Sequence, residues 1–296
     1  MKLGFIGFGE ASYEMSIGLR DEGLKNIVAF DPLWNNDKFG ELIRQRADKA
    51  DVKLKNNLDD VVKVVDVVIV AVPADKALAV CNTLLPNLKR EIIYVDVSAS
   101  TPDVKSEINN CLSQRDIKFV DAAMMGPLPV YRHRVPMLTS GSGVTEFIDK
   151  MNQYNMNISK VSDTAGEASA VKLIRSIFMK GFPALLIEML EAARKFNIED
   201  LVIKSISETM DGRTFEETMN RLVTGTSIHA NRRAIELRGT IKMLESSSLD
   251  CIMSKGACEK LEKLGEFNFK EEFHGITPGS WEEVIDALQI KRPSNL

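Results

Sequence analysis

Residues 2–12 read KLGFIGFGEAS, and this stretch decides the fold because a short apolar run leads directly into a glycine-rich turn. The run has the length of one buried strand, and the residues after the turn have the pattern of a helix. The first glycine, Gly7, permits a tight turn, and the second, Gly9, lets a pyrophosphate approach the backbone. The third position, Ser12, needs a small side chain where the helix packs on the strand.

The turn supplies six candidate cofactor-binding residues: Gly7, Phe8, Gly9, Glu10, Ala11 and Ser12. Free N–H groups at the start of the helix are expected to bind phosphate. The next apolar run ends at Asp31, where a carboxylate would accept hydrogen bonds from both hydroxyls of the adenosine ribose. No arginine or lysine follows before Lys38, so a partner for a 2′-phosphate is missing, and the sequence favours NAD over NADP. The alternative is that Asp31 only initiates the turn before Pro32.

Two more turns follow apolar runs and belong to the edge of an α/β sheet where ligands bind, the carboxyl ends of the strands. Val72 and Pro73 end one run, and Ser98 follows the next. We expect all three residues to line the cofactor site, with Pro73 forming a wall beside the nicotinamide ribose. The alternative for Pro73 is that it simply terminates a strand.

The first half of the chain alternates short β-branched runs with polar helical stretches, which predicts βαβ units. Strands are expected at 2–6, 27–31, 67–72, 92–96, 119–122 and 136–140, with weaker ones at 52–54 and 157–161. Beyond them the β pattern disappears. The fold class is therefore α/β, a Rossmann-type doubly wound parallel sheet followed by an all-α C-terminal domain. We place the dinucleotide-binding domain at residues 1–163 and the helical substrate and dimerisation domain at residues 164–296.

The helical half should begin with one long helix over 166–196, with a kink at Gly181-Phe182-Pro183. Further helices are expected at 199–210, 214–222, 228–246, 249–264 and 281–288. Ser280 and Glu283 have the spacing of a capping box at the start of the last one.

Composition restricts the classes of function. The chain has 296 residues, 44% hydrophobic and 27% charged, and no apolar run near the roughly 20 residues that span a bilayer. The net charge of -4, without a basic stripe, argues against nucleic acid as a partner. The start, Met1-Lys2, runs straight into the first strand and leaves no room for a signal peptide, so a cytoplasmic location is expected. The four cysteines lack metal-ligand spacing, so no metal site is predicted.

Two further segments carry a resemblance. Residues 121–127 read DAAMMGP, and residues 166–176 read GEASAVKLIRS, in which Lys172 follows a glycine by six positions. With the glycine turn, these segments resemble the β-hydroxyacid dehydrogenase family, which includes 3-hydroxyisobutyrate, tartronate semialdehyde and 6-phosphogluconate dehydrogenases. The resemblance runs through at least residues 1–185.

The resemblance implies roles for particular residues. The segment with Met124, Met125 and Gly126 would bind substrate, although Met125 stands where the family has a serine, which leaves backbone N–H groups to replace the lost hydroxyl. Lys172 would be the general acid/base. Ser176 stands where an asparagine is usual, one helical turn after Lys172, and would orient the substrate. The alternative for Lys172 is a solvated lysine on the helix surface.

The C-terminal half looks like that of a poorly characterised branch of phosphogluconate-dehydrogenase-like oxidoreductases, with TSIHANRR at residues 226–233. Its cations, with those near Lys172, could hold the carboxylate or phosphate of a small anionic substrate. They are Arg175, Lys180, His229 and Arg232. A solvated or subunit-interface role is the alternative, and a long helix followed by short amphipathic ones predicts a homodimer or larger homo-oligomer.

Three hypotheses about function follow. The first is an NAD-dependent dehydrogenase of a small β-hydroxyacid. The second is a reductase of imines or another carbonyl-like substrate on the same fold, for which the changes at Met125 and Ser176 leave room. The third is a dinucleotide-binding protein without catalytic activity.

Overall fold

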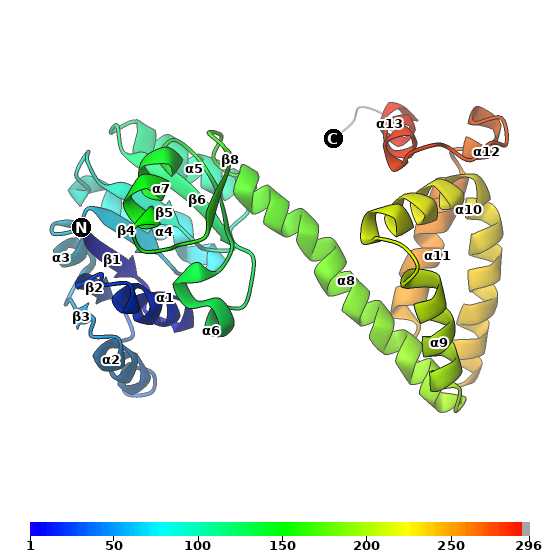
Figure 1. The fold of residues 1–296 in the computed structure, drawn as a ribbon, viewed down its shortest axis with the longest axis horizontal. Helices are drawn as coiled ribbons and strands as arrows, with labels where there is room; N and C mark the ends of the chain where they lie inside the picture. The colour runs from blue at the N-terminus through cyan, green and yellow to red at the C-terminus, as the bar shows by residue number, and fades with distance from the viewer. Residues whose placement is uncertain (292–296) are drawn as a thin grey trace. The chain divides into compact units, whose positions relative to one another are not determined.

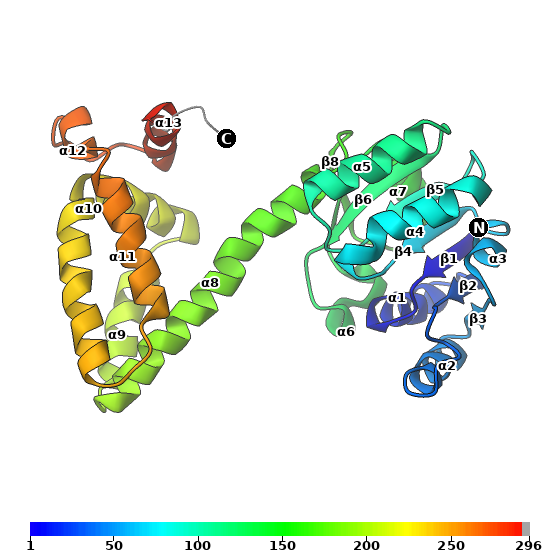
Figure 2. The same ribbon diagram turned by 180° about the vertical axis from the view of Figure 1, so that it is seen from behind.

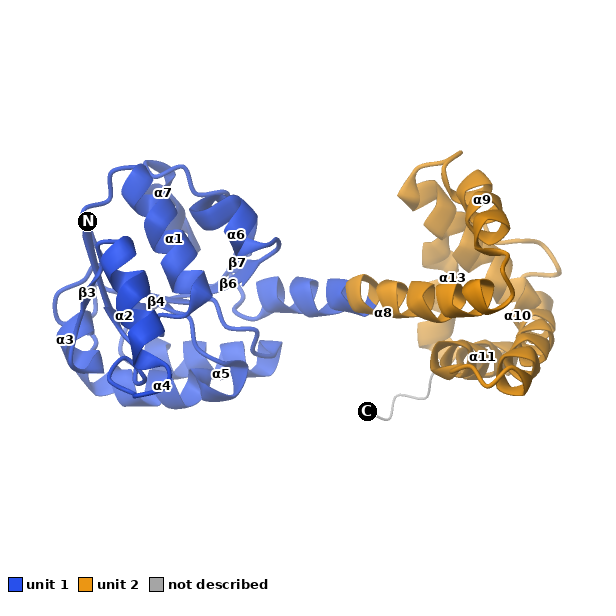
Figure 3. Cartoon of the chain, turned by 90° about the horizontal axis from the view of Figure 1, so that it is seen from below, with its two compact units in different colours: residues 1–177 blue, residues 178–296 orange. Residues whose placement is uncertain are grey.

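The structure is a computed structural model that describes residues 1–291. Its contacts divide it into two compact units, with the division between Ile177 and Phe178. Figure 3 shows the two units in different colours, and the division falls inside helix α8 (Glu167–Lys195). Each unit is described by itself below.

Unit 1 contains one eight-stranded sheet with the strand order β3-β2-β1-β4-β5-β6-β7-β8. The strands are β1 (Lys2–Ile6), β2 (Asn26–Phe30), β3 (Lys53–Leu54), β4 (Val67–Val70), β5 (Ile93–Asp96), β6 (Lys118–Met124), β7 (Met137–Ser140) and β8 (Ile158–Ser162). The order 3-2-1-4-5 of the first strands is that of a Rossmann fold, which confirms the predicted fold class. All eight expected strands are present, with ends shifted by one or two residues.

The last two strands run opposite to the other six. β7 runs antiparallel to β6, and β8 is parallel to β7. Between Met124 and Met137 the only regular elements are the four-residue helix α6 (Leu128–Tyr131) and a 3-10 turn at Arg132–Arg134. A parallel return usually runs through a full crossover helix, and this connection contains none, so the chain comes back antiparallel.

Helices cover both faces of the sheet (Figures 1 and 2). One face carries α1 (Glu10–Asp21), α2 (Gly40–Lys49) and α7 (Val144–Asn152). The other carries α3 (Leu58–Val62), α4 (Ala77–Leu84) and α5 (Pro102–Ser113). This is the doubly wound arrangement, and it explains why most of the strands are apolar along their whole length.

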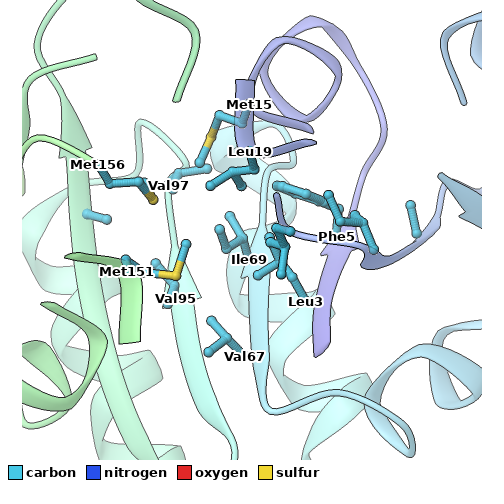
Figure 4. Packing of buried hydrophobic residues seen from close by; sticks show 14 of the residues in the cluster. Leu3, Phe5, Met15, Leu19, Val67, Ile69, Val95, Val97, Met151 and Met156 are labelled. Carbon is cyan, nitrogen blue, oxygen red and sulfur yellow. The ribbon is translucent and has the colours of Figure 1, made fainter. Parts of the chain in front are cut away.

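The core of unit 1 is split by the sheet into two clusters. In β4, Val67 and Ile69 belong to the cluster under α1, whereas Val68 belongs to the cluster under α4. Successive side chains of a strand point to opposite faces, so one continuous apolar run supplies both clusters. Figure 4 shows part of the first cluster, where Met15 and Leu19 of α1 lie near the side chains of the central strands.

Unit 2 is helical. It contains the second part of α8, then α9 (Glu199–Met210), α10 (Phe215–Ser246), α11 (Ile252–Gly265), α12 (Phe269–Glu272) and α13 (Trp281–Lys291). Helix α8 continues through Pro183. Within residues 1–291, no helix is long and apolar enough to cross a membrane.

The prediction of two helices at 214–222 and 228–246 is wrong, because α10 is continuous over both. The break was expected at Gly225-Thr226-Ser227, which are weak helix formers. Within the helix, the Ser227 hydroxyl donates to the carbonyl oxygen of Thr224 at 2.7 Å, so its polar group is satisfied without leaving the helix. A capping box also fixes the start of α10, where Thr214 and Glu217 exchange hydrogen bonds of 2.9 and 3.2 Å.

The packing of α1 leads to a stability prediction. A Cβ at Gly18 would lie 1.9 Å from Nδ1 of the buried His133, so Gly18→Ala should lower the free energy of unfolding by about 1 to 3 kcal/mol. At Gly256 in α11 a Cβ meets open space, and Gly256→Ala should raise stability by about 0.5 to 1 kcal/mol, the ordinary helix-propensity gain. Thermal and urea unfolding of both variants check this. If both substitutions changed the free energy of unfolding equally, the contact between a Cβ at Gly18 and His133 would not determine stability.

Candidate active site

The glycine turn after β1 is held by contacts that exclude a side chain at its first position. Gly7 has a φ of +84°, and a Cβ there would lie 2.3 Å from the carbonyl oxygen of Ala71, at the end of β4. At Gly9, by contrast, a Cβ would find no heavy atom within 4 Å. Gly9 is the N-cap of α1 and provides no side-chain cap. The first N–H groups of α1 therefore have no acceptor from an N-cap side chain, and the missing Cβ at Gly9 leaves room for a phosphate group beside them.

Two of the six turn residues have side chains that belong to the core. Phe8 is fully buried and its ring makes an edge contact with Phe5 at a centroid distance of 6.3 Å. Ser12 is also fully buried, and its hydroxyl donates to the carbonyl oxygen of Gly7 at 2.6 Å. This bond closes the turn from the helix side, which is why a serine serves at the third position. Glu10 is exposed and Ala11 is half-buried at the start of α1.

Asp31 lies directly after β2 and is joined to the same turn. Its Oδ2 accepts a hydrogen bond from the Phe8 N–H at 2.7 Å, and its Oδ1 accepts one from the Leu33 N–H at 2.9 Å. The bond from the Leu33 N–H forms an Asx turn, so Asp31 also initiates the turn before Pro32, the alternative role that the sequence allowed. An ionised carboxylate offers about four acceptor sites, so both bonds leave capacity for ribose hydroxyls.

The turns after β4 and β5 are bonded to each other. The hydroxyls of Ser98 and Ser100 share a hydrogen bond of 2.8 Å, and the Ser100 hydroxyl donates to the carbonyl oxygen of Ala74 at 3.0 Å. Val72 and Pro73 precede Ala74, so three of the predicted cofactor residues lie in two connected turns. The side chain of Ser98 is buried, and its hydroxyl is used in this connection.

The segment with Met124, Met125 and Gly126 ends β6 and is half-buried. The Met125 N–H donates to the carbonyl oxygen of Pro136 at 2.8 Å. The expectation that backbone N–H groups replace the lost serine hydroxyl is therefore wrong at Met125, because the return of the chain toward β7 uses that donor. This position presents a thioether side chain and no free backbone donor.

The connection after this segment is clamped to α1. Arg132 pairs with Asp21 at 3.0 Å, and Glu22 accepts hydrogen bonds from Arg134 and, at 2.7 Å, from Asn155. Between them, His133 is buried, with Nε2 3.5 Å from a Glu22 oxygen. The candidate substrate segment is thus tied to the helix that begins at the glycine turn.

Lys172 lies in the second turn of α8 and is half-buried. The Ser176 hydroxyl donates to the carbonyl oxygen of Lys172 at 2.9 Å, so within unit 1 its proton is used inside the helix and its oxygen remains an acceptor. Arg175, beside it, is exposed.

The remaining predicted substrate residues belong to unit 2. His229 and Arg232 of α10 line a cavity of about 480 Å³, together with polar side chains that include Asn231, Asn268 and Lys270. Arg232 also lies 3.6 Å from Glu236. Lys180 is an exposed residue of α8 and does not line this cavity.

A buried charge cluster was missed by sequence reasoning. Lys105 of α5 lies between Asp96, at the end of β5, and Asp121 of β6, and all three side chains are fully buried. The available signal was a pair of aspartates at the ends of neighbouring apolar strands. Among residues 1–291, no group of three or more histidine, cysteine, aspartate and glutamate side chains could hold a metal ion.

Comparison with known proteins agrees with this geometry. The NAD binding domain of 6-phosphogluconate dehydrogenase matches residues 2–153, which run from β1 to the end of α7. The chain belongs to the 6-phosphogluconate dehydrogenase-like family of NAD-binding proteins. The family resemblance inferred from the glycine turn and from residues 121–127 and 166–176 is confirmed. A domain of unknown function, DUF1932, matches residues 193–264 of the helical half.

Individual relatives of this 6-phosphogluconate dehydrogenase-like protein cover most of its length. An uncharacterized 28.5 kDa protein of the 7S RNA 5′ region of Methanothermus fervidus is 31% identical over 255 residues, 86% of this chain and 95% of the relative. A conserved protein of unknown function, described as structurally similar to 3-hydroxyacid dehydrogenases, is 29% identical with a TM-score of 0.61, covering 90% of this chain and 97% of that one.

More distant structures share the fold. The imine reductase from Myxococcus stipitatus in complex with NADP+ has a TM-score of 0.71 at 14% identity, and its V8 variant in complex with NAD+ has 0.70 at 17%. Both alignments cover 90% of this chain and 94% of the other. At family level the chain is an NAD(P)-dependent oxidoreductase.

The clamp at His133 predicts how stability depends on pH. Burial of the imidazole lowers the pKa of His133 below the usual 6.5, against the opposing charge of Glu22. Below pH 6.5 the unfolded chain therefore binds the proton more readily than the folded one, so stability is fully present above that pH and declines as the pH falls. The hydrogen bond from Arg134 lowers the pKa of Glu22, whose contribution is lost only below about pH 4.5.

Urea unfolding between pH 8 and 5 should therefore show falling stability, and His133→Gln should flatten that fall. The same replacement at the exposed His229 is the matched control. A pH dependence that His133→Gln leaves unchanged would contradict the assignment.

Proposed function

We propose that this protein transfers a hydride between NAD and a small β-hydroxyacid, or its oxo form, with Lys172 as the proton-transfer group. The observation that carries the proposal is the carboxyl edge of the sheet in unit 1. This edge carries the glycine turn after β1, the carboxylate of Asp31 after β2 and the two connected turns after β4 and β5. The substrate segment ends β6 of the same sheet, and β8 leads into α8, the helix that carries Lys172.

The chemistry requires a proton acceptor beside the reacting hydroxyl. Bound NAD would supply the hydride acceptor, and the alcohol proton must leave as the carbonyl forms. A lysine amine serves as base when its surroundings favour the neutral form, and as acid in the reverse reaction. The half-buried position of Lys172 and the family motif around it support this role. The acceptor oxygen of Ser176, one turn along, would orient the substrate.

The preference for NAD rests on Asp31. A ribose with two free hydroxyls can donate to this carboxylate, whereas a 2′-phosphate would meet a negative charge. The described contacts of Asp31 are with backbone N–H groups, and no arginine or lysine lies between positions 31 and 38. The imine reductase structures with NADP+ and with NAD+ show that this fold accommodates either cofactor. We therefore attribute the preference of this chain for NAD over NADP to Asp31, the residue that follows β2.

A reductase of imines or carbonyl-like compounds is the second candidate. The specific observation is Met125, whose side chain replaces a hydroxyl and whose N–H is bonded to Pro136. A pocket wall with fewer polar donors suits a less polar substrate. One panel tests both candidates: 2-hydroxy and 3-hydroxy acids, sugar acids, their oxo forms and cyclic imines, with NAD(H) and NADP(H). No absorbance change with any of them would favour a binding protein without turnover.

We assign dinucleotide binding to residues 1–163 and substrate binding and dimerisation to residues 164–296. In the helical part, His229 and Arg232 would hold an anionic group in the cavity of about 480 Å³ that they line. Arg175 and Lys180 of α8 do not line this cavity, and anion binding by these two residues is a separate proposal. Arginine forks match carboxylates and phosphates geometrically.

A homodimer is expected because unit 2 leaves many apolar side chains uncovered. Residues of α8 and α9 with two-fifths or more of their surface exposed include Leu185, Ile187, Leu190, Leu201 and Ile203. Apolar side chains of α8, α9 and α10 also line a hollow of about 550 Å³. Exposed apolar surface of this extent is typical of an interface, and a second copy offers the same complementary helices. Light scattering at micromolar concentration should give twice the chain mass. A fully active monomer would overturn this.

Cofactor preference has a direct test at Asp31. Calorimetry should show tighter binding of NAD(H) than of NADP(H), and Asp31→Ala should weaken NAD binding roughly 10- to 150-fold, the equivalent of about 1.5 to 3 kcal/mol. Asp31→Asn keeps only one of the two acceptor oxygens that the Phe8 and Leu33 N–H groups use, so an unfolding temperature equal to that of wild type is the control for damage to the turn. If wild type prefers NADP(H), the assignment fails.

The chemical step is tested at Lys172. With a substrate from the panel, Lys172→Ala should lower kcat by about 10²- to 10⁴-fold while NAD affinity changes little. Lys195, exposed at the end of the same helix, gives the matched control Lys195→Ala, which should keep turnover within a few-fold of wild type. Near-normal kcat in a folded Lys172→Ala protein would contradict the mechanism.

A further inference from the structure

Three fully buried charged side chains from three elements meet inside unit 1. The Lys105 ammonium donates to the carbonyl oxygens of Asp96 and Ser98, each at 3.0 Å. It also lies 3.2 Å from Oδ2 of Asp96 and 3.4 Å from Oδ1 of Asp121. Charges without solvent persist in a core only when paired and hydrogen-bonded. The arrangement of this cluster is therefore strongly constrained.

Asp121 extends the cluster to the first turn of α8. Its Oδ2 accepts from the Ser169 N–H at 2.9 Å, and its Oδ1 accepts from the Ser169 hydroxyl at 2.6 Å. The Ser140 hydroxyl donates to Oδ2 of Asp121 at 3.2 Å and accepts from the Ala168 N–H at 3.0 Å. These N–H groups have no partner within the helix, and an anion at a helix start is favourable. Asp121 thus caps α8 from a neighbouring strand.

The path into α8 is restricted as well. Gly166, the residue before the helix, has a φ of +98°, and a Cβ there would lie 2.8 Å from the carbonyl oxygen of Pro102. Pro102 is the first residue of α5, the helix that carries Lys105. The first turn of α8 is therefore fixed on one side by α5 and on the other by Asp121. Lys172 follows Ser169 by three residues, less than one turn, so this anchoring sets where its side chain starts.

We infer that Asp121, held by Lys105, is a positioning residue for Lys172. This rests on the proposed role of Lys172. Asp121 is also the first residue of the segment 121–127 that ends in the candidate substrate wall, so one carboxylate ties that wall to the helix of the proton-transfer group. A merely structural ion cluster would stabilise unit 1 without affecting the environment of Lys172.

The test measures Lys172 itself and needs no substrate. Competitive acetylation of the whole protein with acetic anhydride between pH 6 and 10, read by peptide mass spectrometry, reports the reactivity of each lysine. Asp121→Asn should change the acetylation rate of Lys172 at least threefold relative to Lys195, the exposed lysine at the far end of α8. Ser169→Ala removes only the hydroxyl on Oδ1 and should give a smaller change in the same direction. Ser113→Ala is the matched control, because its hydroxyl donates to the carbonyl oxygen of Asn110 within α5 and touches neither the cluster nor the start of α8.

Steady-state kinetics then separate the positioning role of Asp121 from the proposed proton-transfer role of Lys172. Asp121→Asn should lower kcat by up to about 10²-fold with NAD affinity within a few-fold of wild type, because a small misplacement of a catalytic group can cost that much. If Asp121→Asn is folded and leaves both the acetylation profile of Lys172 and kcat unchanged, the inference is overturned. Should that variant fail to fold, Ser169→Ala behaving like Ser113→Ala overturns the inference instead. Normal turnover in Lys172→Ala would refute the proposed function, whatever the Asp121 variants do.

Discussion

The close approach of Gly7 to the carbonyl oxygen of Ala71 is the constraint on which the carboxyl edge of the sheet depends. A Cβ at Gly7 would stand 2.3 Å from that oxygen, so any other residue would force β1 and β4 apart or change the turn. Because β1 and β4 are parallel neighbours, their turns leave the sheet at the same edge. The Gly7 N–H donates to Phe30 at the end of β2, which brings the third strand to the same place. The open N-terminus of α1 and the carboxylate of Asp31 follow from this junction.

The far side of the same edge is held by polar contacts in place of a close backbone approach. Ser100 links the turns of β4 and β5, and Lys105 and Asp121 link β5 and β6 to α8. Cofactor and substrate segments therefore differ in what fixes them. The first position of the glycine turn tolerates no side chain, whereas the substrate side depends on a buried charge network. Substitutions on the two sides should accordingly damage binding and chemistry separately.

Local patterns in the sequence predicted most of unit 1, because its strands are short apolar runs and its turns carry glycine, proline or aspartate. The antiparallel β7 was not predictable from its own residues, since strand direction depends on whether the connection after Met124 contains a full crossover helix. Continuous α10 was missed because Gly225 to Ser227 have weak helix propensity, which tertiary packing overrides. For the site, Gly7, Gly9 and Asp31 lie where their pattern placed them. The loss of the Met125 N–H to Pro136 and the pairing of Lys105 with Asp121 depend on residues distant in sequence, which no local pattern reveals.

The buried cluster also raises the question of why charges occupy a place that apolar side chains would fill at lower cost. Removing three charged groups from water is expensive, and buried ion pairs often stabilise a protein less than well-packed hydrocarbons do. The cluster holds one formal positive and two formal negative charges, and Asp121 accepts hydrogen bonds from the partially positive start of α8. An apolar replacement would fill the volume but would leave the Ser169 N–H without its acceptor, and the Ser140 hydroxyl, which accepts from the Ala168 N–H, would lose its own acceptor. Asp121 can hold the start of α8 at one angle only if its own position is fixed, and the ion pair with Lys105 fixes it. The network is therefore better explained by the geometry it imposes on α8 than by the stability it adds.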